Sequence, residues 1–371
     1  MKKLFVGLII IIIGALAGYF AYSYYITTDY YFEKKLETLK YSDEAKQVIK
    51  DNDLIKEIIN KDLYSKTLET ALTSEYFDAN NINAYYELKY VEEEDYIYNI
   101  NTLLKSGYTT DNIKSIYESL NSENIKKTVE SNYNSNLLSY LNLSYFRQSN
   151  YDRYLNYGKA NTNYSNEDIV TYVNIGLDYD YYSHVTNVTN PDEINVLVNK
   201  YSKLASNFVP SDLSTIDGKC STSTLKLKTV ARDAFQELCY DAISSGLSVL
   251  ASSTYRSYNY QLGLYNTYVA RDGQSKADTF SAKPGYSEHQ TGLAVDVSSG
   301  TSNMDDFEKT NEFTWMVNNS YKYGFILRYP ENKEHITGYM YESWHYRYVG
   351  KEIAEYIYNN NLTYDEYMAR Q

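Results

Sequence analysis

The sequence predicts an α+β protein, in which a small, mainly antiparallel sheet flanked by helices follows an N-terminal transmembrane helix and a helical region. An uncharged stretch runs from Leu4 to about Tyr25, and apolar residues recur at helical spacing through much of the first half. After Pro191, strand-like segments mix with helical ones without a regular strand–helix alternation, which favours an α+β arrangement. The expected domains are 1–27, 28–194 and 195–371.

The N-terminal stretch predicts a membrane anchor. Roughly twenty uncharged residues are enough to span a bilayer as a helix, and Lys2 and Lys3 precede the stretch. Lysines in this position favour a cytoplasmic N-terminus, so a single-pass protein of the cell membrane is expected, with everything after Tyr25 outside. The alternative is secretion after cleavage of a signal peptide, because residues 15–17 resemble a small-residue cleavage site. Both interpretations predict export.

Charge limits the partners that the protein can have. The 371 residues include 35 Lys and Arg against 48 Asp and Glu, which gives a formal net charge of −13. No basic stripe interrupts this acidity, so nucleic acid is a poor candidate for a partner. Anionic lipid headgroups would repel a negative surface, and attachment to a membrane must therefore be hydrophobic. The oligomeric state is not fixed by any of these features.

The region from about residue 33 to residue 190 reads as short helices joined by polar links. Segment 109–120 has apolar residues at helical spacing after a threonine cap, and Ser165 with Asp168 predicts another capped helix start. We interpret the region as a helical stalk or a wall-interaction module, with a simple spacer as the alternative. His184 lies here without a second type of metal ligand nearby, and we expect it to have no function of its own.

Strand and helix patterns follow one another in the C-terminal region. Segment 193–204 alternates like a strand, and a helix is expected around residues 230–242, before Gly246. Further strands are expected in segments 247–257, 292–299, 323–330 and 344–350, and further helices in 307–322 and 350–361.

The two cysteines, Cys220 and Cys239, allow two interpretations. In an exported protein they could form a disulfide, since an oxidising compartment permits it. They could equally remain unpaired as small hydrophobic residues. A zinc role is disfavoured because no C-x-x-C spacing occurs.

The segment YSEHQTGLAVDVSS, residues 286–299, holds the first candidate for chemistry. As a strand, 292–299 places Leu293, Val295 and Val297 on one face and Asp296 on the other. An isolated buried carboxylate there would be costly unless it were paired or bound to a metal. His289 precedes the strand across a turn. By themselves these residues make half of a metal site, and a surface turn running into an ordinary strand explains them as well.

The second half of such a site lies about fifty residues further on, where Glu342 and His345 are three positions apart. Together, His289, Asp296 and His345 would offer zinc two neutral imidazoles and one carboxylate, and would leave a fourth position open. The net positive charge of that set polarises a carbonyl and acidifies water. Glu342 would then act as general base. The alternative makes Glu342 and His345 ordinary surface residues.

Several motifs resemble one enzyme family. SEHQTGLAVD is similar to the S-x-H-x-x-G-x-x-x-D signature, and ESWH to the E-x-W-H signature, of zinc D-alanyl-D-alanine carboxypeptidases of the VanY type and their LD-carboxypeptidase relatives. STYRSYNYQ resembles the arginine motif of this family, and YGFILRYP also follows in the same order. The resemblance covers about residues 195–371 and does not extend into the helical region.

The resemblance implies a role for each matching residue. His289, Asp296 and His345 match the zinc ligands, and Glu342 matches the catalytic base. No metal or base position departs from the pattern, which argues against an inactive copy.

Three more residues match positions near the substrate. Arg256 matches the arginine that engages substrate beside the scissile bond, and its fork geometry suits a carboxylate or a developing oxyanion. Ser287 and Gln261 match positions near the pocket and are expected to contact substrate. His335 matches no motif position and is expected at the surface, in a polar turn that leads into a strand.

The expected function is that of a zinc metallopeptidase, which hydrolyses the C-terminal D-Ala-D-Ala bond of peptidoglycan stem peptides and releases D-alanine. The alternatives within the family are LD-carboxypeptidase action on tetrapeptide stems and cleavage as a dipeptidase. A non-catalytic cell-wall-binding protein with a vestigial metal site is the alternative from another class. No S-x-x-K or G-x-S-x-G motif supports a serine enzyme.

Overall fold

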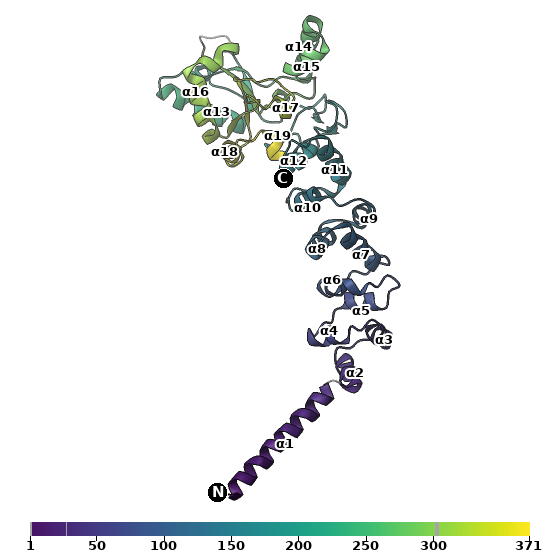
Figure 1. Ribbon diagram of the computed structural model, residues 1–371. Helices are drawn as coiled ribbons and strands as arrows, with labels where there is room; N and C mark the ends of the chain where they lie inside the picture. The colour runs from purple at the N-terminus through teal and green to yellow at the C-terminus, as the bar shows by residue number, and fades with distance from the viewer. Residues whose placement is uncertain (1, 27, 301–303) are drawn as a thin grey trace. The chain divides into compact units, whose positions relative to one another are not determined.

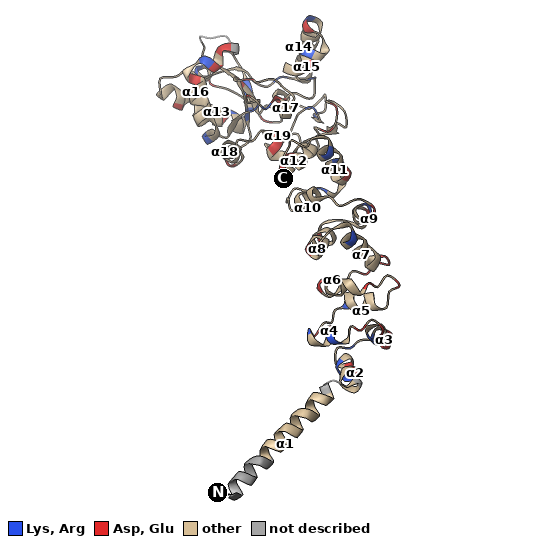
Figure 2. Cartoon of the chain, viewed as in Figure 1, with Lys and Arg blue, Asp and Glu red and all other residues tan. Residues whose placement is uncertain are grey.

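The computed structural model describes residues 2–26, 28–300 and 304–371 and shows a mixed α+β protein with a helical N-terminal region and small, mainly antiparallel sheets (Figure 1). The chain divides into two compact units, Met1–Asn142 and Leu143–Gln371. Lys and Arg positions lie among Asp and Glu positions in both units (Figure 2). The domain boundary that the sequence suggests, between residues 194 and 195, stays a prediction.

The N-terminal unit consists of helices, most of them short. Side chains cap many of these helices: Thr109 and Asn112, for example, form a capping box at the start of α8. The helices are α1 Lys2–Ile26, α2 Asp29–Thr38, α3 Asp43–Asp51, α4 Ile55–Asn60, α5 Lys66–Leu72, η1 Ala79–Asn81, α6 Ile82–Glu87, α7 Tyr96–Ser106, α8 Thr110–Ser119, α9 Ser122–Glu130 and α10 Ser135–Leu141.

The apolar N-terminus gives only a weak indication of a membrane segment. Among the described residues no single helix qualifies as a membrane span, although segments Ile11–Tyr25 and Tyr30–Thr38 qualify together as a pair bent by 66°. The expected anchor begins at Leu4, and its side chains up to residue 10 lie outside the described part of the structure. Residue 27 lies outside it too. The membrane anchor therefore stays a prediction.

The C-terminal unit combines helices with three small sheets. Its helices are η2 Gln148–Asn150, α11 Tyr151–Ala160, α12 Asn166–Ile175, η3 Gly218–Cys220, α13 Thr229–Ser244, α14 Tyr258–Asp272, α15 Gln274–Phe280, η4 Glu288–Thr291, η5 Met304–Lys309, α16 Asn311–Asn319, η6 Ser320–Tyr323, α17 Glu334–Thr337, α18 Lys351–Asn360 and α19 Tyr364–Ala369. Its strands are β1 Thr186–Asn187, β2 Ser202–Lys203, β3 Leu213–Thr215, β4 Lys226–Lys228, β5 Leu250–Ser253, β6 Ala294–Ser298, β7 Phe325–Leu327 and β8 His345–Tyr348.

The four-stranded sheet carries the candidate site. Its order is β5-β6-β8-β7, and every neighbouring pair is antiparallel. Leu293, Val295 and Val297 lie in the same hydrophobic core cluster as Phe235 of α13, which confirms the face expected from the alternation. Asp296 is therefore on the opposite face of β6.

Two expectations about local structure were wrong. Segment 193–204 does not form one strand, because the carbonyl groups of Ile194 and Val196 accept hydrogen bonds from the buried Arg347 guanidinium instead of from a neighbouring strand. Only β2 forms there, and it pairs in parallel with β1. His335 is exposed, as expected, but it lies in the short helix α17 and not in a turn leading into a strand.

The cysteines that the sequence left open form a disulfide. Cys220 at the end of η3 is bonded to Cys239 in α13, with a Cα–Cα distance of 5.9 Å. The bond ties the helix to the turn that precedes it.

Candidate metal centre and active site

The sheet register brings Asp296 and His345 together. These residues are direct partners on the neighbouring strands β6 and β8, so their side chains leave the sheet on the same face. His289 reaches the same point from η4, which is followed by the capping residue Gly292 with φ +68°. A Cβ on Gly292 would lie 3.2 Å from the backbone nitrogen of Lys228 and 2.9 Å from Leu213 Cδ2, so this tight turn requires glycine.

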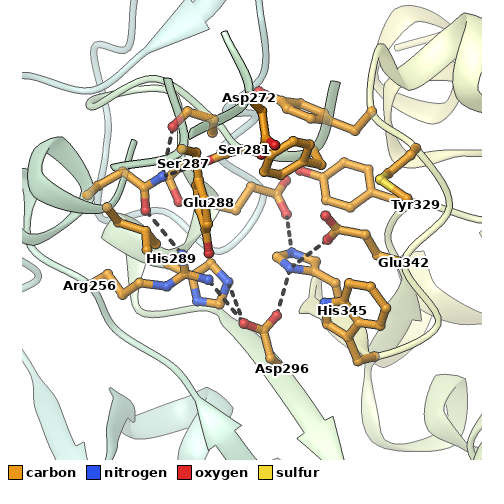
Figure 3. A pocket seen from close by; sticks show the side chains of 18 of the residues that line it. Arg256, Asp272, Ser281, Ser287, Glu288, His289, Asp296, Tyr329, Glu342 and His345 are labelled. Atoms are coloured by element: carbon orange, nitrogen blue, oxygen red, sulfur yellow. Dashed lines mark hydrogen bonds and ion pairs between the residues drawn. The ribbon is translucent and has the colours of Figure 1, made fainter. Parts of the chain in front are cut away.

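The three expected ligands form a buried cluster (Figure 3). His289 Nε2 lies 3.3 Å from Asp296 Oδ2, and His345 Nδ1 lies 3.0 Å from Asp296 Oδ1. One ligand atom from each residue can be chosen so that all lie within 4.8 Å of one another. Two imidazoles and a carboxylate at this spacing can hold a metal ion.

The hydrogen bonds of His289 fit metal binding. Its Nδ1–H donates to the Thr254 carbonyl at 2.7 Å, which leaves the lone pair of Nε2 directed into the cluster. That Nε2 is buried and has no hydrogen-bond partner. A buried nitrogen without a partner is costly, and a bound cation would satisfy it. The nitrogen and oxygen donors are those that zinc prefers in three-ligand sites.

Glu342 lies beside the cluster without belonging to it. Its Oε2 is 3.7 Å from His345 Nδ1, and burial raises the pKa of its carboxyl to about 7. A carboxyl with a pKa near neutrality can both accept and return a proton at physiological pH. The structure thus places the expected base next to the expected ligands.

Charge within the cluster is distributed unevenly. Burial lowers the pKa of His289 to about 4. For His345 burial acts in the same direction, but the hydrogen bond to Asp296 and the nearby Glu288 carboxylate outweigh it and raise the pKa to about 9. Burial opposes ionisation of Asp296, yet hydrogen bonds from the protonated His345 and from Arg256 hold its pKa well below the usual range. The metal-free cluster is therefore a carboxylate with one neutral and one protonated imidazole.

Arg256 and Gln261 form a connected pair in the pocket wall. Arg256 Nη2 donates to Asp296 Oδ2 at 3.0 Å, and its Nη1 donates to Gln261 Oε1 at 3.1 Å. Gln261 in turn donates to the Ala282 carbonyl at 2.7 Å. The geometry makes Gln261 a support for Arg256, in addition to lining the pocket. Ser287 is buried and lines the same pocket.

A cavity of about 460 Å³ opens above the cluster. The cluster lines it together with Arg256 and Glu342, and so do residues of the helices α14 and α15. The residues that α14 and α15 contribute are Gln261, Leu264, Tyr268, Arg271, Asp272, Lys276 and Phe280. The cavity is thus continuous from the cluster to a wall that carries charged and aromatic side chains.

Sequence reasoning missed a set of buried charges behind the cluster. Glu288 accepts from Arg328 at 2.7 Å and from Arg347 at 3.0 Å, and Arg328 also donates to Asp365 at 2.6 Å. These side chains are at most 1% exposed. Arg347, an arginine within the apolar strand pattern of 344–350, could have indicated these buried charges, since a buried arginine requires partners.

The two other histidines lie outside the cluster. His184 is exposed and its ring stacks on Tyr179 with centroids 3.8 Å apart. His335 is exposed and contacts the ring of Tyr172 edge-on. Within the described part of the chain, only His289 and His345 are histidines of the candidate metal site.

Comparison with known proteins gives consistent results. Residues 224–351 match the model of the VanY family, described as D-alanyl-D-alanine carboxypeptidase. A putative carboxypeptidase of Bacillus subtilis, YodJ, is 42% identical over 190 residues, which are 49% of this chain and 70% of that protein. A D-alanyl-D-alanine carboxypeptidase of Enterococcus faecium is 35% identical over 187 residues, and the match covers 50% of this chain and 52% of that enzyme.

Two solved structures are also similar over the C-terminal region. The LdcB LD-carboxypeptidase is 42% identical, with a TM-score of 0.48, and the match covers 51% of this chain and 91% of that one. A vancomycin-resistance D,D-pentapeptidase VanY in complex with Zn(II) is 32% identical, with a TM-score of 0.42, over 47% of this chain and 98% of that one.

Proposed function

Because the chain belongs to the VanY family of D-alanyl-D-alanine carboxypeptidases, we propose that it removes the terminal D-alanine from peptidoglycan stem peptides. The observation that carries this proposal is the buried cluster of His289, Asp296 and His345 with Glu342 beside it, at the base of an open cavity. The catalytic domain is expected to span 195–371.

We propose that the ion is zinc and that the three cluster residues hold it. A bound zinc ion polarises the scissile carbonyl and acidifies a water molecule. The partnerless Nε2 of His289 and the ionised carboxylate of Asp296 supply donors suited to that ion.

The protein residues would divide the remaining tasks. Glu342 accepts a proton from the attacking water on its carboxylate and passes it to the amine of the departing D-alanine, a role that its raised pKa supports. Arg256 offers its guanidinium to the oxyanion that develops on the carbonyl or to the terminal carboxylate of the substrate. Gln261 holds Arg256 in place, and Ser287 contacts substrate in the pocket wall.

The shape of the cavity supports a peptide longer than a dipeptide. The wall formed by α14 and α15 extends the cavity beyond the cluster, and Arg271 and Lys276 lie on it. A stem peptide that placed its terminal residues at Glu342 would have earlier residues along this wall. Carboxypeptidase action therefore fits better than cleavage of a free dipeptide.

The test uses the full-length protein in detergent, loaded with zinc and given pentapeptide and tetrapeptide stems in parallel. We expect release of one D-alanine from each pentapeptide, and a loss of about 10³-fold or more in kcat for Glu342→Gln, because general base catalysis is removed while the ligands remain. His335→Gln, at an exposed position outside the cluster, should retain wild-type activity.

Three results would refute the proposal or change it. No release from either peptide by the wild type would refute the enzymatic function, as would a Glu342→Gln variant as active as the wild type. Release from the tetrapeptide alone would reassign the specificity to LD-carboxypeptidase action.

Export of the catalytic domain completes the proposal. We propose a single-pass anchor near the N-terminus with the domain outside the membrane, where peptidoglycan lies. The disulfide between Cys220 and Cys239 supports this location because such bonds persist in oxidising compartments. The helical region would set the distance between membrane and catalytic domain.

A further inference from the structure

Two buried polar atoms face each other behind the candidate metal site (Figure 3). Glu288 Oε2 and His345 Nε2 are both buried, neither has a hydrogen-bond partner, and they lie 3.6 Å apart. A closer approach of about 0.4 Å would bring them to the upper end of ordinary hydrogen-bond distances. A hydrogen bond between the two atoms would therefore satisfy both of them.

The other oxygen of Glu288 is fixed from the opposite side. Oε1 accepts hydrogen bonds from Arg328 and Arg347, and Arg347 is itself held by the backbone carbonyls of Ile194 and Val196. With Asp365 bound to Arg328, the set contains two carboxylates and two guanidiniums, which are formally neutral together. The Glu288 carboxylate can therefore stay ionised without exposure to water, and its free oxygen remains aimed at His345.

The opposite side of the His345 ring points at the metal position. Nδ1 lies 3.0 Å from Asp296 Oδ1 and 3.7 Å from Glu342 Oε2. A neutral imidazole carries its proton on one nitrogen only, and a metal can bind only the other. A group that accepts a hydrogen bond from Nε2–H keeps the proton on Nε2. Nδ1 is then the nitrogen that can bind the metal.

We propose that Glu288 is a positioning residue that accepts a hydrogen bond from His345 Nε2–H and so presents His345 Nδ1 to the metal. The proposal rests on the metal site of the proposed function. Glu288 and His289 are adjacent in η4, so one short helix supplies a ligand and also orients a second ligand that belongs to β8. Carboxylates in this relation to a ligating histidine fix its ring and its tautomer.

The test measures zinc affinity of the full-length protein by competition with a chelator, without any substrate. Glu288→Gln should bind zinc about 10 to 100 times more weakly than the wild type, the usual effect of losing such a partner. Asp365→Asn is the matched control, because it removes a carboxylate from Arg328 in the same buried set without touching His345. Its zinc affinity should stay within about threefold of the wild-type value.

A second readout reports the tautomer directly. The chain has four histidines, so selective ¹⁵N-histidine labelling gives a small set of ring signals. In zinc-loaded wild type, His345 should show a protonated Nε2 and a metal-bound Nδ1, and Glu288→Gln should alter this signal while Asp365→Asn does not. If Glu288→Gln fails to fold, Glu288→Asp keeps the charge opposite the arginines, withdraws the oxygen from His345 and should weaken zinc binding as well.

The outcomes separate this inference from the proposed function. Equal losses of affinity in Glu288→Gln and Asp365→Asn would show a merely structural role and overturn the inference. Unchanged affinity and unchanged His345 signals in Glu288→Gln would overturn it too, while the peptidase proposal would stand. A wild-type protein that binds no zinc would overturn both.

Discussion

At the scale of single residues, burial and neighbouring charges determine which side chains of the candidate site are protonated. Burial keeps His289 neutral, whereas the hydrogen bond to Asp296 and the nearby Glu288 carboxylate keep His345 protonated at neutral pH in the metal-free protein. The two expected histidine ligands therefore differ in readiness for a metal. His289 can bind at once, but His345 must first lose a proton.

Zinc affinity is consequently expected to depend on pH. The pKa of His345 is about 9 without metal, so protons compete with zinc at every pH below that value. The proton displaced from His345 makes the affinity rise by about tenfold per pH unit, hence by at least about 100-fold between pH 6 and pH 8. Glu342, with a pKa of about 7 beside the cluster, adds to this rise because a bound cation favours its ionised form. His289 titrates near pH 4 and contributes no slope in this range.

Chelator competition at several pH values measures this slope. A zinc affinity that does not change between pH 6 and pH 8 would contradict the protonation state assigned to His345. The exposed His335→Gln variant serves as control and should reproduce the wild-type slope.

Residue patterns also explain which parts of the site could be predicted. His289, Asp296, Glu342 and His345 fall in two short motifs, so the spacing of these residues in the sequence was informative. Glu288 lies inside one of these motifs, but its partners come from other elements of the chain. A pairing that depends on tertiary contacts leaves no local spacing to recognise.

At the scale of elements, η4 and the turn that closes it at Gly292 set the positions of Glu288 and His289. Gly292 has φ +68° and lies against Lys228, whose backbone N–H donates to the Gly292 carbonyl at 2.8 Å. A side chain at this position would be strained by its backbone conformation and by the close contacts together.

Gly292→Ala is therefore expected to destabilise the protein by about 1 to 3 kcal/mol. The matched control is Gly263→Ala, because Gly263 lies in α14 with no atom within 4 Å of an added Cβ. That change should be neutral or slightly stabilising. Chemical unfolding of both variants measures the difference, and equal stabilities would contradict the role given to the Gly292 turn.

Elements also mark where prediction from the sequence succeeded and failed. The alternation of 292–299 correctly gave the side chains of this segment that pack in the hydrophobic core, because that face is set by local pleating. The similar alternation of 193–204 was misleading. There the backbone carbonyls bond to Arg347, about 150 residues further along the chain, and a local pattern cannot reveal such a partner.

At the scale of the whole molecule, the proposed membrane anchor can be tested by extraction. We expect the full-length chain to remain in the membrane fraction after alkaline extraction, because about twenty uncharged residues bury more apolar surface than an amphipathic contact would. Mass spectrometry of the extracted chain provides the control. A soluble chain shortened near residue 17 would contradict the anchor and favour a cleaved signal peptide.

The cluster of His289, Asp296 and His345 is proposed as a zinc-dependent carboxypeptidase site. The most direct measurement is the rate of D-alanine release from a pentapeptide stem as zinc is titrated into the metal-free, full-length protein. We expect the rate to rise in proportion to bound zinc and to reach a plateau at one ion per chain, with Glu342→Gln inactive throughout. Release that is independent of zinc, or its absence from the fully loaded wild type, would contradict the account.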